Sequence, residues 1–453
     1  MQPLPKEFEE QMKRLLGEAG FFAYLDALNQ PYTRALRVNL LLRPDGTPPC
    51  PIEGLGAPVP WAKGAYFVEG DARPGLSPLH EGGLFYMQEP SALTAVTALD
   101  PQSGERVLDL CAAPGGKSTQ IAALMAGRGL LCCNEPIPSR AQILSRNIER
   151  MGVRNAVVLS AMPDALAPRF PAFFDRILVD APCSGEGMFR RQPEARDEWD
   201  ADAPRRCADR QMEILAQAAK MLRPGGTMVY STCTFNDTEN EGVLKRFLAL
   251  HPEFSLVPFA LPGLPEAKDG YLHLYPHEMR GEGHFVSRLK KADGADEADA
   301  PVQAAPQRKA PARAAAKGKA PAPIALPDVF SDAFAPERLY TAGDALWMLP
   351  EGISIERLSG LRVLRTGLLL AHAEGKRSEP DHALAMALRP EEAARTASLT
   401  QTQALAYQAG ETLSLGDLPG GYTLLCCEGV SLGWGKQAGG LMKNHYPKGL
   451  RRR

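Results

Sequence analysis

Two cysteines occupy matching positions in the sequence, each directly after a short run of apolar and β-branched residues. Cys183 follows "ILVDAP", and Cys233 follows "GTMVYST". A buried cysteine is usually an inert packing residue, but thiols at the ends of two buried strands can share one pocket. A thiolate in such a pocket can activate an unreactive ring carbon. When it adds to C6 of cytosine, C5 becomes nucleophilic enough to attack a methyl donor.

Two charged residues could act beside these thiols. Asp180 ends the apolar run before Cys183, where it could hold the edge of a base or donate a proton through its protonated form. Because a carboxyl group at that depth loses hydration, we expect its pKa to be raised. Lys117 could add positive charge to the same pocket, although a solvated lysine at a helix start fits the sequence equally well. The catalytic candidates are Cys233, Cys183, Asp180 and Lys117.

The segment "DLCAAPGGKSTQ", residues 109–120, has the features of a turn between a strand and a helix that approaches a cofactor. Its adjacent glycines, Gly115 and Gly116, allow the backbone to come close to a ligand. The spacing fits neither the GxGxxG pattern of a dinucleotide site nor the P-loop, which disfavours NAD and ATP. Glu135, nineteen residues after Gly116, could accept hydrogen bonds from both hydroxyl groups of an adenosine ribose. S-adenosylmethionine, an adenosine cofactor without pyrophosphate, fits best.

The elements that must position these residues alternate regularly along the chain. Five short apolar runs are separated by segments of helical pattern, at residues 106–111, 129–135, 156–161, 176–182 and 226–233. This alternation predicts an α/β fold with a doubly wound, Rossmann-like parallel sheet of the methyltransferase type. In that strand order the fourth and fifth strands are neighbours, so Cys183 and Cys233 are expected to face one pocket at the carboxyl ends of the strands.

The end of the third predicted strand departs from the usual pattern of such enzymes. An acid commonly lies there, close to the adenine, but this sequence has Met162 or Pro163 at that place. Asp164 is the candidate substitute after a shift of one or two residues.

The chain length and composition allow several domains. With 453 residues, 44% of them hydrophobic, two or three cores can form. We expect a small N-terminal α+β lobe over residues 1–78 and the methyltransferase domain over 79–291. Residues 292–322, rich in Ala, Pro and Lys, predict a disordered linker before a C-terminal region over 323–453. The sequence has no signal pattern, no apolar stretch near the roughly 20 residues of a membrane span and no Cys/His metal spacing, so we expect a cytoplasmic protein without a metal site.

Basic residues are concentrated at the C-terminal end, although the net charge is only −2. Six Lys/Arg residues and no acid occur from Gly435 onward, with Trp434 and Tyr446 nearby. This mixture is typical of a surface that stacks on a polynucleotide, and a solvated tail is the alternative. Arg190 and Arg191 are further candidates for contacts with RNA phosphates, with plain surface solvation equally compatible.

Three motifs together resemble those of one known family. "DLCAAPGGKSTQ", "DAPCSGEGMFRR" and "YSTCTFNDTENE" are similar to the motifs of the Sun/Nop family of RNA cytosine-5 methyltransferases, and most similar to its bacterial RsmF type, which acts on 16S rRNA. The likeness extends to "RVNLLL" near the start and "GWGKQAGGLMKNHYPKGLRR" near the end, so it covers most of the chain.

The resemblance implies specific roles. It makes Cys233 the nucleophile and Cys183 the thiol that helps to release the product, whereas DNA cytosine methyltransferases, whose nucleophile follows proline, suggest the opposite assignment. It also implies a PUA-like RNA-binding module in the C-terminal region and a ferredoxin-like or RRM-like N-terminal lobe. The cofactor contacts that it implies are Cys111, Ala112, Ala113, Pro114, Gly115, Gly116, Lys117, Glu135 and Asp180.

The leading hypothesis is methyl transfer from S-adenosylmethionine to C5 of cytosine in RNA, through a covalent adduct between a cysteine and C6. The expected partner is 16S rRNA or the small ribosomal subunit, and the target base must leave its stack to reach the pocket. Two alternatives remain: a tRNA cytosine-5 methyltransferase, and a non-catalytic RNA-binding factor for ribosome assembly. A dehydrogenase is disfavoured because the GxGxxG pattern is absent.

Overall fold

A computed structural model describes residues 3–294, 324, 329, 338–374 and 377–451. The predicted linker, residues 292–322, lies outside the described residues except for its first three positions.

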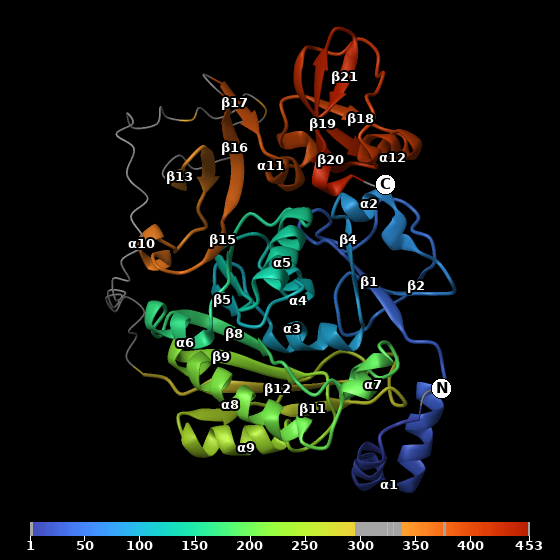
Figure 1. Ribbon diagram of the computed structural model, residues 1–453, viewed down its shortest axis with the longest axis vertical. Helices are drawn as coiled ribbons and strands as arrows, with labels where there is room; N and C mark the ends of the chain where they lie inside the picture. The colour runs from blue at the N-terminus through green and yellow to red at the C-terminus, as the bar shows by residue number, and fades with distance from the viewer. Residues whose placement is uncertain (1–2, 295–323, 325–328, 330–337, 375–376, 452–453) are drawn as a thin grey trace.

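One large sheet crosses the centre of the molecule (Figure 1). Its five parallel strands have the spatial order β7-β6-β5-β8-β9, so β8 and β9 are neighbours as predicted. Antiparallel strands extend the sheet beyond β9 and beyond β7. The parallel strands are β5 (Arg106–Asp109), β6 (Leu130–Asn134), β7 (Ala156–Leu159), β8 (Phe174–Asp180) and β9 (Leu222–Thr232), and the antiparallel ones are β10 (Phe254–Leu256), β11 (Tyr271–Leu274), β12 (His284–Lys291) and β15 (Val363–Thr366).

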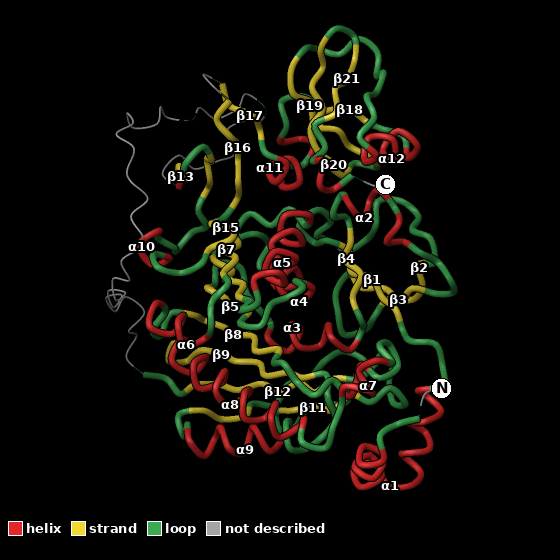
Figure 2. The backbone as a smooth tube through the Cα atoms, in the orientation of Figure 1, coloured by secondary structure: helices red, strands yellow, loops and turns green. Residues whose placement is uncertain are grey.

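Helices cover both faces of this sheet, because successive apolar side chains of each strand point to opposite sides. In β5, Val107 packs into one hydrophobic core and Leu108 into the other. Figure 2 shows the two helical layers. One layer contains α3 (Thr94–Leu99), α4 (Gly116–Leu124) and α5 (Pro138–Arg150), and the other contains α6 (Pro163–Leu166), α8 (Ala203–Met221) and α9 (Glu241–Leu250). The predicted doubly wound, Rossmann-like fold class is confirmed.

The N-terminal lobe contains a four-stranded antiparallel sheet with the order β2-β3-β1-β4. Its last strand follows residue 78, so the predicted boundary falls inside this sheet. The long first helix is interrupted at Gly17, where φ is 68°. The ferredoxin-like or RRM-like description of this lobe stays a prediction. Its elements are α1 (Lys6–Leu28), β1 (Arg34–Val38), β2 (Leu55–Pro58), β3 (Ala65–Val68), α2 (Pro78–Glu81) and β4 (Phe85–Gln88). A short helix from the later part of the chain, α7 (Glu194–Glu198), lies near α1.

The C-terminal region forms two further sheets and also contributes to the central one. Strand β15 pairs with β7 and completes the edge of the methyltransferase sheet, a contact that the sequence did not reveal. Residues 338–388 contain β13 (Leu339–Ala342), β14 (Ala345–Met348), α10 (Ile355–Leu358), β16 (Leu368–Glu374), β17 (Arg377–Pro380) and α11 (His382–Ala387). The last part contains β18 (Thr396–Ser398), α12 (Gln401–Ala409), β19 (Gly421–Cys427), β20 (Val430–Ala438) and β21 (Leu441–Asn444).

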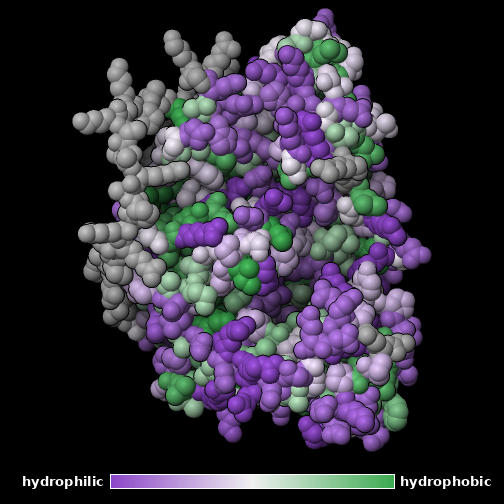
Figure 3. Space-filling model, in the orientation of Figure 1, coloured by the Kyte–Doolittle hydropathy of each residue, from purple (hydrophilic) through white to green (hydrophobic). Residues whose placement is uncertain are grey.

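No helix within the described residues combines the length and the apolar character that crossing a bilayer requires. Hydrophilic residues cover most of the face shown in Figure 3.

Candidate active site

The carboxyl ends of the parallel strands open into a cavity of about 840 Å³. Residues from the ends of β5, β6, β7, β8 and β9 all contribute to its lining, as expected for a doubly wound sheet. Helix α8 adds one face, with Arg210, Glu213, Ile214 and Gln217 following helical spacing. The strand ends therefore place Cys111, Glu135, Asp180, Cys183 and Cys233 around the same cavity.

Two residues of the glycine-rich turn after β5, Cys111 and Ala113, line this cavity. Gly115 has a φ of 114°, a conformation that residues with a side chain rarely adopt, so glycine is favoured there; a Cβ would also lie 3.2 Å from the Leu144 side chain. The Ala112 N–H donates to the Asn134 carbonyl (2.9 Å), and the Asn147 side chain donates to the Pro114 carbonyl (2.9 Å). These contacts fix the turn before any ligand binds.

The predicted cofactor residues fall into two groups. Cys111, Ala113, Glu135 and Asp180 line the cavity, as do Met162, Pro163 and Asp164 at the end of β7. The remainder of the predicted set shapes the turn without lining the cavity: Ala112, Pro114, Gly115, Gly116 and Lys117. Asp164 therefore lines the cavity near the end of β7, where an acidic residue close to the adenine was expected.

Glu135 is held in position at the end of β6. Its side chain is only 4% exposed. Oε1 accepts a hydrogen bond from the Ile137 N–H (2.9 Å), and Oε2 lies 3.4 Å from Nη1 of Arg140. Asp109, which ends β5, was not among the predicted residues. Burial raises its pKa to about 7, and its Oδ1 has no donor among the described protein atoms.

Asp180 lies at the centre of a charged cluster. Lys117 Nζ lies 2.8 Å from Oδ2, the Ser231 hydroxyl donates to Oδ1 (2.8 Å), and His284 Nε2 lies 3.5 Å from Oδ1. Burial alone would raise the pKa of Asp180, but Lys117 and His284 together outweigh it and hold the pKa well below its ordinary value. The predicted raised pKa was therefore wrong, and Asp180 is a carboxylate that accepts hydrogen bonds.

His284 is the member of this cluster that sequence reasoning missed. It begins β12, and pairing between β12 and β9 brings it to the carboxyl edge of the sheet. Its side chain is 4% exposed, and Nε2 makes no hydrogen bond of good geometry within the described residues. Its role was missed because its place beside Asp180 depends on strand pairing across more than fifty residues.

The two thiols meet inside the cavity. The Cys183 and Cys233 sulfur atoms are 3.3 Å apart, and both residues line the cavity. The contact with Cys233 and burial both raise the pKa of Cys183 well above its ordinary value. Cys183 is therefore a neutral thiol at neutral pH, next to the sulfur of Cys233.

Arg190 does not serve as a phosphate contact. Its guanidinium lies 2.7 Å from Glu282, and these side chains are 7% and 3% exposed. It also donates to the Ala27 carbonyl (2.7 Å), which fastens α1 to the catalytic domain. This expectation was wrong because the arginine has buried partners that are distant in sequence. Arg191 is exposed, and its contact with RNA stays a prediction.

Trp434 and Tyr446 do not form a surface platform for RNA bases. Their exposed fractions are 2% and 3%. The Trp434 indole donates to the Asp381 carbonyl (2.8 Å), and Tyr446 packs edge-on against Tyr407. Both aromatic residues belong to the core of the C-terminal part, so the sequence-based expectation of a stacking surface was wrong.

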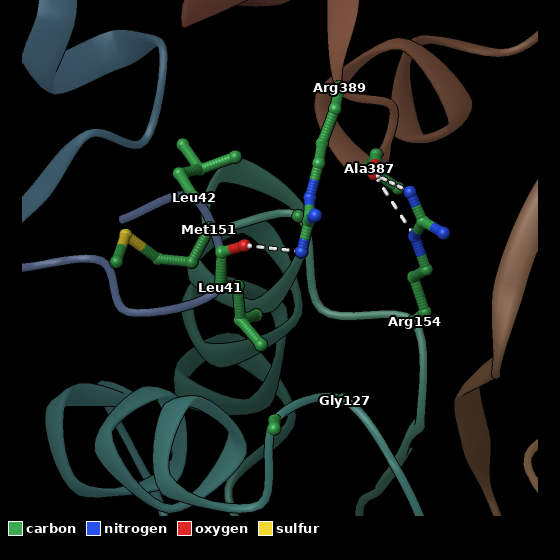
Figure 4. Close-up of a pocket in the computed structure, with 9 residues that line it drawn as sticks. Leu41, Leu42, Gly127, Met151, Arg154, Ala387 and Arg389 are labelled. Atoms are coloured by element: carbon green, nitrogen blue, oxygen red, sulfur yellow. Dashed lines mark hydrogen bonds between the residues drawn. The ribbon is translucent and has the colours of Figure 1, made fainter. Parts of the chain in front are cut away.

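A smaller cavity of about 140 Å³ lies where the N-terminal lobe, the catalytic domain and the C-terminal region meet (Figure 4). Arg389 reaches across it to the Leu41 carbonyl (3.3 Å), and Arg154 donates to the Ala387 carbonyl. Arg389 and Arg154 thus use their charged groups to connect the parts of the chain around this cavity, and we do not assign a ligand to it.

Four family models match consecutive parts of the chain. Their descriptions are the N-terminal domain of 16S rRNA methyltransferase RsmF (residues 4–90), 16S rRNA methyltransferase RsmB/F (96–290), the RsmF rRNA methyltransferase first C-terminal domain (327–388) and the methyltransferase RsmF PUA domain (394–452).

Individual proteins are also similar to this chain over most of its length. The chain is 34% identical to the ribosomal RNA small subunit methyltransferase F of Erwinia tasmaniensis, over 98% of this chain and 96% of that protein. It is also 34% identical to the protein of that name from an Enterobacter species, over 98% and 95%. Among solved structures, a methyltransferase homolog protein from Pyrococcus horikoshii is 30% identical, with a TM-score of 0.54, over 63% of this chain and 95% of that one.

Proposed function

The chain belongs to the 16S rRNA methyltransferase RsmB/F family, and from that premise we propose that Cys233 and Cys183 carry out its reaction through a covalent adduct with RNA. The protein is an S-adenosylmethionine-dependent enzyme that methylates C5 of cytosine in 16S rRNA. The resemblance noted in the sequence is thereby confirmed. The catalytic steps and the roles of individual residues are the proposal.

The residues at the strand ends fit the cofactor. Glu135 offers buried carboxylate oxygens at the end of β6, where a ribose would lie, and the cavity of about 840 Å³ also has room for a base. The unpaired Oδ1 of Asp109 is a buried acceptor at the base of the glycine-rich turn. We propose that Cys111, Ala113, Glu135 and Asp164 hold S-adenosylmethionine, which supplies an electrophilic methyl group when bound.

We propose that the Cys233 thiolate adds to C6 of the cytosine and thereby makes C5 nucleophilic. Asp180, as a carboxylate, accepts hydrogen bonds from the amino edge of the base and holds the ring between the sulfur and the cofactor. After C5 is methylated, a water molecule takes the C5 proton, the C5–H electrons re-form the C5–C6 double bond, and the Cys233 sulfur leaves C6 as a thiolate. Cys183 assists this release, since its sulfur is 3.3 Å from the leaving sulfur.

The observation that carries this proposal is the approach of two thiols inside a cavity that Cys111 and Ala113 of the glycine-rich turn also line. Methyl incorporation from radiolabelled cofactor into unmodified 16S rRNA tests it. Cys233→Ala should abolish incorporation, and Cys183→Ala should leave a protein–RNA adduct that survives a denaturing gel. The reverse pattern in the two variants would exchange the roles of the thiols.

We also propose that the substrate is presented in the small ribosomal subunit, in the cytoplasm. The names of the relatives, which specify the small ribosomal subunit, and the match to a PUA domain support an RNA partner. Comparing methylation rates of naked 16S rRNA and of unmethylated subunits tests this point, and equal rates would contradict it.

A further inference from the structure

Two buried glutamates link the loops that bear the thiols. Glu186 lies three residues after Cys183, yet it serves the loop that follows Cys233. Its Oε2 accepts hydrogen bonds from the backbone N–H groups of Phe235 (2.8 Å) and Asn236 (3.0 Å). Its exposed fraction is 0%. One thiol loop therefore supplies a carboxylate that fixes the backbone of the other.

Glu239 makes the reciprocal contact. It lies six residues after Cys233, and its Oε2 accepts hydrogen bonds from the backbone N–H of Ser184 (3.0 Å) and from Gln211 Nε2 (2.8 Å). Its Oε1 accepts hydrogen bonds from the Ser184 hydroxyl and from Asn236 Nδ2 (2.8 Å). Four donors thus converge on one carboxylate whose exposed fraction is 0%. Burial raises the pKa of Glu239, and these hydrogen bonds favour its ionised form.

Direct contacts between the loops complete this arrangement. The Ser184 and Thr234 hydroxyl oxygens are 2.8 Å apart, and the Gly187 N–H donates to the Cys233 carbonyl (2.8 Å). Neither glutamate lines the large cavity, so neither is in a position to touch a substrate there. Their contacts instead determine how far apart the two loops lie.

The two thiols depend on this arrangement to different degrees. Cys233 follows β9 directly, and β9 is paired on both sides with β8 and β12. Cys183 lies in a loop beyond β8, where the residues on either side of it are held by Gln211, which donates to the Pro182 carbonyl (3.0 Å), and by Glu239. Loss of Glu239 therefore frees Cys183 more than Cys233.

We propose that Glu239 and Glu186 are positioning residues that hold the two thiols within reach of the same pyrimidine, Glu239 acting on Cys183 and Glu186 on the segment after Cys233. This inference rests on the proposed function, because it assigns each carboxylate to one half of the adduct mechanism. Glu239 serves release of the product, and Glu186 serves formation of the adduct.

Single-turnover and multiple-turnover methylation, together with denaturing gels, test this assignment in the full-length enzyme. Glu239→Ala should form the methylated adduct at a rate within about threefold of the wild type. Because release depends on the position of Cys183, steady-state turnover should fall about 10- to 100-fold and adduct should accumulate. Glu186→Ala should instead slow adduct formation. Glu239→Gln, which keeps one acceptor oxygen, should recover part of the turnover.

The control is Asp237→Ala, which removes an exposed acid from the same segment and should behave like the wild type. Equal slowing of both steps in both glutamate variants, without accumulated adduct, would overturn the inference and leave the glutamates with a purely structural role. The same conclusion follows if Glu239→Ala accumulates no adduct while Cys183→Ala does. If Cys183→Ala itself accumulates none, the proposed roles of the thiols fail, and this inference fails with them.

Discussion

Replacing Lys117 with methionine tests whether this lysine controls the charge of Asp180. The substitution removes the ammonium group that lies 2.8 Å from the carboxylate and keeps an unbranched side chain in its place. Burial, which favours the neutral carboxyl group, is then opposed mainly by His284. We therefore expect the pKa of Asp180 to rise.

The size of this effect follows from the geometry. Opposite unit charges 2.8 Å apart attract by about 6 kcal/mol at an effective dielectric constant near 20. Because Asp180 is 28% exposed toward the cavity, solvent screening reduces this to about 3 kcal/mol. At 1.36 kcal/mol per unit, the pKa of Asp180 should rise by about 2 units.

The assay is single-turnover methyl transfer by the Lys117→Met enzyme and the wild type between about pH 3 and about pH 8, a range that extends to the ordinary carboxyl pKa. The quantity compared is the ratio of the variant's rate to the wild-type rate at each pH. This ratio should decrease toward acid pH, because only the variant protonates the carboxylate that must accept hydrogen bonds from cytosine. Lys245→Met, at an exposed position of α9, is the control and should show a constant ratio. A constant ratio for Lys117→Met would refute the reasoning.

Four further outcomes follow from the same structure. A depressed carboxyl pKa stabilises the fold above the ordinary pKa, and this contribution is lost as pH falls through the folded-state pKa. The difference in melting temperature between wild type and Lys117→Met should therefore be constant above about pH 5 and shrink below about pH 4. Arg190→Ala breaks a buried ion pair and should cost about 3–5 kcal/mol of stability in thermal melts. Arg191→Ala should leave stability unchanged and lower the salt dependence of RNA binding by roughly one phosphate contact. Trp434→Ala removes a core side chain and should cost about 3–5 kcal/mol, measured as faster limited proteolysis of the C-terminal part; unchanged proteolysis would contradict its assignment to the core.

The sequence predicted the parts of the site that local patterns determine. Cys183 and Cys233 each follow an apolar run, and the parallel sheet implied by the alternating elements brings the ends of two neighbouring strands together. The glycine-rich turn was also predicted from a local pattern. Its Gly115 adopts a conformation that other residues rarely adopt, so the glycine itself indicates the turn.

The parts that the sequence did not predict depend on contacts between distant segments. The pKa of Asp180 was expected to rise because burial was evident. Lys117, already a candidate for the pocket, lowers it most, and His284 adds to this only through the pairing of β12 with β9. Trp434 occurs among basic residues in the sequence, but β20 is buried along most of its length and places this side chain in the core. Neither effect follows from neighbours in the chain.

The most direct test of the central claim is to identify the amino acid that carries the RNA adduct. Cys183→Ala enzyme would be incubated with unmodified 16S rRNA and S-adenosylmethionine, digested with nuclease and trypsin, and analysed by tandem mass spectrometry. We predict a methylated cytidine attached to Cys233. Attachment at any other residue, or methylation of RNA without an adduct in this variant, would contradict the account.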